Sequence, residues 1–191
     1  MKKLLLILAT TSCFASAANW QLNPEQSSLN FVSIKNTTVA ETHQFSNLSG
    51  SWSDQGLVKI QIPVSSLETN IPIRNQRMLD FVLKAKQYTE ITAQAEIKPD
   101  TIATLAVSKS MVITLPITVS IAGESTTLMA NIRVLKLNAS TIQASTESPL
   151  ILNVDSANLT AGVDKLQQLA QLNDISKVVP VTFSVNFSTE I

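Results

Sequence analysis

The chain has 191 residues, a length typical of one domain with its own core. Lys plus Arg and Asp plus Glu both total 14, so the chain lacks the basic surplus that holds a nucleic-acid backbone, and no nucleic-acid partner is expected. One Cys (Cys13), one His (His43) and four Gly exclude a Cys/His metal cluster and a glycine-rich phosphate loop.

Residues 1–17 have the order of a secretory signal. Two lysines precede the apolar run Leu4 to Ala9, and small residues follow at positions 15–17. Cleavage after Ala17 would remove Cys13 and leave a single domain of residues 18–191. No later run reaches the roughly 18 apolar residues of a membrane span. We therefore expect a periplasmic or secreted protein without a transmembrane segment.

Alternation of apolar and polar residues is the main structural signal, and it is typical of strands with one buried face. Strict alternation covers residues 58–64, 91–97, 110–122 and 181–188. Weaker candidates cover residues 29–34, 43–52, 128–137, and 141–154 with a break near Pro149. Connections as short as that from Ala122 to Ser125 require antiparallel neighbours. We predict about eight antiparallel strands, with Pro116 at an edge or a bulge and residues 99–109 as a turn.

Two segments have helical spacing instead. Residues 72–84 begin with Pro72, follow the possible cap Asn70 and carry apolar residues at helical intervals. Residues 160–172 place an apolar stripe opposite a polar face. We predict two short helices, and both stripes are compatible with simply covering an open end of the sheet.

About eight antiparallel strands either close into a barrel or stack as a sandwich. An eight-stranded barrel has room for one small ligand. The inward positions of the central strands are Ile, Val, Leu and Met, and only 5% of residues are aromatic, which favours an aliphatic lining. An ordinary filled core remains the alternative.

The order of several short motifs resembles the YceI-like family. Trp20 to Pro24 with Ser27 and Phe31 is similar to the family's opening, and Ser66 to Asn70 followed by Arg74 to Phe81 is the best match. Further matches lie at residues 87–91, 119–125 and 149–183, so that the resemblance covers nearly all of residues 18–191. Gln26, Asn75 and Thr89 stand where the family usually has His, Asp and Pro.

The resemblance implies a mainly β fold, an extended lipocalin-like barrel that binds a long apolar molecule in the periplasm. Polyisoprenoids such as ubiquinone are the type ligand, and the resemblance implies no catalytic residue. We expect no metal site and no cofactor other than a bound lipid such as a polyisoprenoid quinone. A homodimer is possible. The predicted ligand cavity comprises Ile60, Ile62, Ile113, Leu115, Ile117, Val119, Phe183 and Val185. The predicted cavity mouth comprises Arg74, Asn75, Arg77, Met78, Phe81 and Tyr88.

Two other functions stay open at this point. A hydrolase would have to combine His43 with a Ser and an Asp. The flanking Thr42 and Gln44 favour a surface position for His43, and the chain contains no Gly-x-Ser-x-Gly elbow. A structural or partner-binding domain without a ligand is the other possibility, and an interior packed solid with side chains would support it.

Overall fold

The protein is mainly β, as the alternation predicts. The computed structural model describes residues 20–189, with eleven strands and three α-helices in that part of the chain. The strands are β1 (Trp20–Lys35), β2 (Val39–Phe45), β3 (Ser49–Trp52), β4 (Leu57–Pro63), β5 (Leu67–Glu68), β6 (Glu90–Glu96), β7 (Ser110–Ile121), β8 (Glu124–Asn138), β9 (Thr141–Thr146), β10 (Leu150–Asn153) and β11 (Val178–Ser188). The helical elements are η1 (Val64–Ser66), α1 (Pro72–Arg77), the π-helical turn η2 (Met78–Val82), α2 (Pro99–Ala103) and α3 (Thr160–Ala170).

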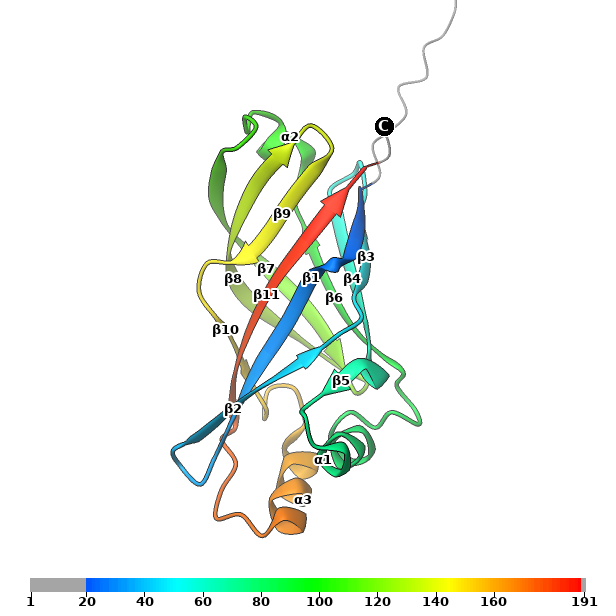
Figure 1. Ribbon diagram of the computed structural model, residues 1–191, viewed down its shortest axis with the longest axis vertical. Helices are drawn as coiled ribbons and strands as arrows, with labels where there is room; N and C mark the ends of the chain where they lie inside the picture. Colours follow the sequence, from blue (N-terminus) through cyan, green and yellow to red (C-terminus); the bar gives the residue numbers. More distant parts are fainter. Residues whose placement is uncertain (1–19, 190–191) are drawn as a thin grey trace, which may run out of the picture.

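Eight strands close into an antiparallel barrel, in the order β1, β3, β4, β6, β7, β8, β9, β11 and back to β1. The closing pair is formed by the first and last strands, where Leu22 lies opposite Phe187 and Leu29 opposite Phe183. Figure 1 shows these two strands, blue and red, side by side along the barrel. The predicted barrel is thus confirmed, and a sandwich of two open sheets is excluded.

Three short strands outside the closed barrel, β2, β5 and β10, extend it at its lower end in Figure 1. The start of β1 pairs with β3 and its second half with β2, while the start of β11 pairs with β10 and its second half with β9. The pairing of β1 with β11 shifts register between Asn23 and Ser28, and the ladder from β1 to β2 and β3 is interrupted over the same stretch. The prediction of one strand over residues 43–52 was wrong. The segment forms two strands that pair with different parts of β1, since β2 ends at Phe45 and β3 begins at Ser49.

The two faces of β7 follow the predicted alternation. Leu115, Ile117 and Ile121 are buried, whereas Thr114, Pro116 and Thr118 are exposed. Successive side chains of a strand point to opposite faces, so one row of β7 must face the barrel interior. The pairing of β7 with β6 runs only from Thr118 to Ser120, so Pro116 lies outside it, where its missing N–H breaks no β6–β7 hydrogen bond.

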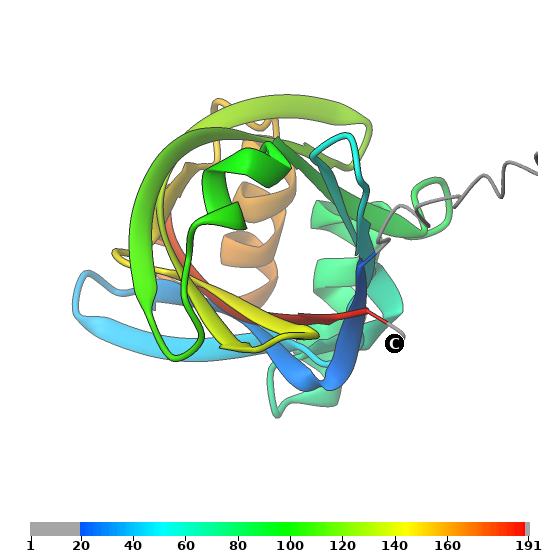
Figure 2. The same cartoon turned by 90° about the horizontal axis from the view of Figure 1, so that it is seen from above.

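Helices lie at both ends of the barrel. Figure 2 shows the green α2 at the near end and the orange α3, with α1, at the far end. The helix predicted from residue 72 is present as α1 and η2, but Ile71 rather than Asn70 immediately precedes it and no side chain caps it. The segment 99–109, predicted as a turn, begins with α2, whose Ile102 is buried in the core. The predicted signal at residues 1–17 lies outside the described residues.

Candidate ligand cavity

A cavity of about 550 Å³ runs through the barrel interior. This volume lies within the range of roughly 300 to 1,000 Å³ that is typical of small-molecule sites. Side chains from strands around the whole barrel line it, together with residues of α1, η2 and α3 at the lower end. The barrel interior is therefore an open, lined space and not a solid core.

Most of the cavity wall is apolar. Seven of the predicted cavity residues line it, namely Ile60, Ile62, Leu115, Ile117, Val119, Phe183 and Val185. Ile113 is not part of the wall; it is half-buried, packs against the core and lies on β7 beyond the last residue pair with β6. The rings of Phe31, Phe45 and Trp52 also line the cavity, so the wall is less purely aliphatic than the composition suggested.

The wall reaches solvent at the lower end, near α1. Ile71 and Ile73 line the cavity and are 41% and 57% exposed, which places its mouth beside this helix. Of the predicted mouth residues, Arg74, Arg77 and Met78 line the cavity.

The other three predicted mouth residues have different surroundings and do not line the cavity. The side chain of Asn75 accepts hydrogen bonds from the Thr69 backbone N–H (2.9 Å) and hydroxyl (2.5 Å), so it fixes α1 to the end of β5. The Tyr88 ring packs closely against Gly123 in the β7–β8 turn. A Cβ added at Gly123 would lie only 2.5 Å from the Tyr88 hydroxyl oxygen. Phe81 lies on η2 and is partly exposed.

A polar cluster at the mouth end was missed by the sequence analysis. It consists of Ser33, Lys35, Glu41 and His43 of the β1–β2 hairpin, all of which line the cavity. The signal that could have found it is the alternation of Glu41, His43 and Phe45 in β2. Alternate residues of a strand share a face, so an inward-facing Phe45 also places Glu41 and His43 on the inner side. In the structure, Phe45 and His43 are both buried.

His43 is an interior residue, contrary to the surface position expected for it. It is only 3% exposed, pairs with Phe31 across the β1–β2 ladder, and its ring centroid lies 5.1 Å from that of Phe31. Its Nε2 is 2.8 Å from the Ser33 hydroxyl oxygen. The polar neighbours Thr42 and Gln44 suggested a wet environment, but they lie on the opposite face of the strand.

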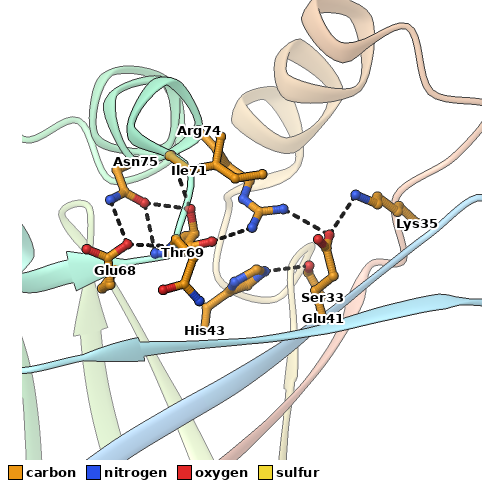
Figure 3. Close-up of polar contacts among 10 residues, drawn as sticks. Ser33, Lys35, Glu41, His43, Glu68, Thr69, Ile71, Arg74 and Asn75 are labelled. Carbon is orange, nitrogen blue, oxygen red and sulfur yellow. Dashed lines mark hydrogen bonds and ion pairs between the residues drawn. The ribbon is translucent and has the colours of Figure 1, made fainter.

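Charged side chains meet beside His43. The carboxylate of Glu41 accepts from Lys35 Nζ at 2.7 Å and from Arg74 Nη1 at 2.9 Å, and Arg74 Nη2 donates to the Thr69 carbonyl oxygen. Figure 3 shows Arg74 reaching from α1 toward the two hairpin strands. The hydrogen bond from Lys35, assisted by Arg74, holds the pKa of Glu41 below its ordinary value, so Glu41 is ionised at neutral pH.

The imidazole of His43 is uncharged at neutral pH. Burial, reinforced by the positive charge of Arg74, lowers the pKa of His43 below its ordinary value of about 6.5. Among the described residues, three buried side-chain atoms have no hydrogen-bond partner, and two of them, His43 Nδ1 and Arg74 Nε, belong to residues that line the cavity. The third is Asn186 Oδ1.

The described residues contain no group of three or more His, Cys, Asp or Glu side chains that could hold a metal ion. In the same part of the chain, no helix is both long enough and apolar enough to cross a membrane.

Comparisons with known proteins agree with this architecture. A family model for the YceI-like domain matches residues 20–187. A solved polyisoprenoid-binding domain from Saccharophagus degradans, implicated in plant cell wall breakdown, is 34% identical with a TM-score of 0.87, over 92% of this chain and 100% of that one. No curated protein matches the chain.

Two further solved structures share the fold at lower identity. BcnA from Burkholderia cenocepacia is 17% identical with a TM-score of 0.65, over 86% of this chain and 98% of that one. A YCEI protein from Campylobacter jejuni is 15% identical with a TM-score of 0.57, over 100% of this chain and 99% of that one. The family model runs from the first residue of β1 to Phe187, the last residue but one of β11. The chain therefore belongs to the YceI-like family.

Proposed function

We propose that this protein binds a long apolar lipid in its barrel cavity, in order to carry, store or sequester it. The observation that supports this proposal is the 550 Å³ cavity with a largely apolar wall and a polar cluster at its mouth. Burial of each methylene group contributes about 0.8 kcal/mol. A long chain therefore gains affinity along its whole length without a hydrogen bond in the interior.

A polyisoprenoid, such as an isoprenoid quinone, is the ligand class we favour, with a fatty-acid derivative as the nearest alternative. The support is the similarity to the Saccharophagus domain, which is described as polyisoprenoid-binding and is 34% identical to this chain. We further propose that the protein acts in the periplasm after export, on the evidence of the signal-like order of residues 1–17.

We propose binding without catalysis. Ser33 and His43 form a hydrogen-bonded pair of the kind a hydrolase uses, with 2.8 Å between Oγ and Nε2. A triad also needs a third group that orients the imidazole through its other nitrogen. His43 Nδ1 has no partner among the described residues, and its lowered pKa makes it a weaker base. The non-ligand alternative depended on a solid interior, and the cavity does not favour it.

The test combines extraction with rebinding. The mature protein is purified from its native compartment, extracted with organic solvent and analysed by mass spectrometry, and the delipidated protein is then titrated with an isoprenoid quinone. We expect a co-purified lipid and saturable binding at one site per barrel. A protein that carries no lipid and binds neither the quinone nor a long-chain fatty acid would contradict the proposal.

A further inference from the structure

We propose that the mouth end of the cavity is a head-group site, in which His43 Nδ1 and Arg74 Nε hold an uncharged hydroxyl or carbonyl oxygen at the polar end of the bound lipid. This inference rests on the proposed function, because it presupposes that a lipid chain fills the apolar part of the cavity. It adds the chemical class of the head group and the residues that select it.

Among the described residues, two polar atoms of the cavity wall are buried and have no hydrogen-bond partner. His43 is 97% buried, and its Nδ1 has no hydrogen-bond partner among the described residues. Arg74 Nε is buried and unpaired in the same sense, and both residues line the cavity. An unpaired buried polar group is costly, so proteins rarely keep one without a ligand, a water or a functional role for it.

Every other side-chain nitrogen of these two residues already has a hydrogen-bond partner. Ser33 holds His43 Nε2 at 2.8 Å, which fixes the orientation of the ring. Glu41 accepts from Arg74 Nη1 at 2.9 Å, and the Thr69 carbonyl accepts from Nη2. Figure 3 shows the guanidinium of Arg74 held between these partners, above the His43 ring. What remains free is one nitrogen on each side chain, in an arrangement that is held in place before a ligand arrives.

The charged groups around His43 are Arg74 of α1, Glu41 of β2 and Lys35 of β1, and both cations already contact the Glu41 carboxylate. A phosphate or carboxylate would approach that same carboxylate, and both cations that could compensate its charge are already paired with Glu41. A single uncharged oxygen matches the two free nitrogens and brings no charge to be compensated.

The pair can serve both kinds of oxygen. A hydroxyl can accept from Arg74 Nε–H and donate to an unprotonated His43 Nδ1, with Nε2–H then donating to Ser33. A carbonyl can accept from Arg74 Nε–H and from a protonated His43 Nδ1, with the Ser33 hydroxyl then donating to Nε2. The Ser33 contact accommodates either tautomer because a hydroxyl can donate or accept.

The experiment compares three probes with one isoprenoid tail: geranylgeraniol, its phosphate ester and the matching hydrocarbon without an oxygen. Each is titrated into delipidated wild-type protein and into His43→Phe, which keeps an aromatic ring in the wall but removes Nδ1. Loss of a hydrogen bond is expected to weaken geranylgeraniol binding about tenfold, while hydrocarbon binding changes less than about twofold. The wild type is expected to bind the alcohol more tightly than the phosphate.

Two further variants complete the design. Phe31→Leu is the matched control, because Phe31 lies beside His43 in the same wall and has no polar side-chain atom; it is expected to alter alcohol and hydrocarbon binding by the same factor. Arg74→Lys keeps the positive charge near Glu41 but removes the Nε–H, and it is expected to weaken the alcohol selectively, as His43→Phe does. Melting temperatures identify any variant that fails to fold.

The outcomes separate this inference from the proposed function. If wild-type protein binds neither the alcohol nor the hydrocarbon, the proposed function itself fails. If both bind and His43→Phe and Arg74→Lys reduce them equally, the lipid site stands and the head-group site is refuted. If the phosphate binds more tightly than the alcohol and depends on Arg74, the head group is an anion and the uncharged assignment is overturned.

Discussion

Gly162 of α3 lies directly against the backbone of Val82 at the end of η2. A Cβ at position 162 would be 2.8 Å from the Val82 Cα and would also collide with the Phe81 carbonyl oxygen. The absence of a side chain therefore lets α3 approach η2 closely at the lower end of the barrel. Since η2 continues from α1, this contact also positions the helix that carries Arg74 at the cavity mouth.

Gly162→Ala is expected to destabilise the protein. In an unconstrained helix this change would stabilise by about 1 kcal/mol, because Ala is the better helix former. Here the added methyl group meets backbone atoms that cannot rotate away, and overpacking costs about 1 to 3 kcal/mol, so the net sign reverses. Chemical denaturation measures the change. Ala161→Gly, on the exposed neighbouring position, is the control and should cost only the helix-propensity difference. Unchanged or higher stability of Gly162→Ala would show that the close approach is not needed.

Ile117→Phe is expected to weaken lipid binding while leaving the melting temperature of the ligand-free protein nearly normal. Ile117 lines the cavity, so a larger side chain can occupy open space and narrow the room for a ligand. Ala130→Leu provides the contrast. Ala130 is fully buried, lies outside the cavity wall and should be overpacked at a cost of about 1 to 3 kcal/mol. Equal quinone binding by Ile117→Phe and wild type, with a strongly lowered melting temperature, would contradict the cavity assignment of this position.

Stability should fall as the pH is lowered from about 7 toward 5, and His43 is the expected cause. The pKa of His43 is lowered in the folded protein, so the unfolded chain takes up the proton first, near the ordinary value of about 6.5. Lowering the pH therefore reduces the free energy of unfolding until the pH falls below the pKa of His43 in the folded protein. Glu41 acts in the same direction at lower pH. Its pKa is lowered in the folded protein, so the unfolded carboxylate is protonated first and the stabilisation is lost as the pH falls toward the folded pKa.

Denaturation of wild type and His43→Phe at pH 7.5 and 5.5 measures this effect. The wild type should lose more stability between the two values than the variant does, because the variant has no imidazole to protonate. Identical pH dependence in the two proteins would mean that His43 titrates alike in the folded and unfolded states.

Export should be accompanied by cleavage of the first 17 residues. The order of charged, apolar and small residues in that segment is that of a cleaved signal, and N-terminal sequencing should give Ala18 or Asn19. Because Cys13 would be removed, thiol reductants should leave the melting temperature of the mature protein unchanged. An intact Met1 in the extracytoplasmic fraction, or a lipid attached to Cys13, would refute this prediction.

Local periodicity by itself determined much of the fold. The side-chain period of a strand is two, so the alternation around Ile117 and Val185 placed both in the interior without knowledge of their neighbours. Helical spacing located α1 and α3 in the same way. Strand number and antiparallel pairing left a barrel or a sandwich, the resemblance to the YceI-like family favoured the barrel, and the pairing of β1 with β11 decides for it.

Only the tertiary structure decided how the mouth of the cavity is built. The alternation with Phe45 indicates the inner face for His43, but its place opposite Phe31 is set by pairing across the hairpin. Asn75 and Arg74 are adjacent in sequence, yet one fixes α1 to β5 and the other lines the cavity. Side-chain partners that are distant in the sequence assign these roles, whereas a single-chain pattern reports only which face of a strand or helix is apolar.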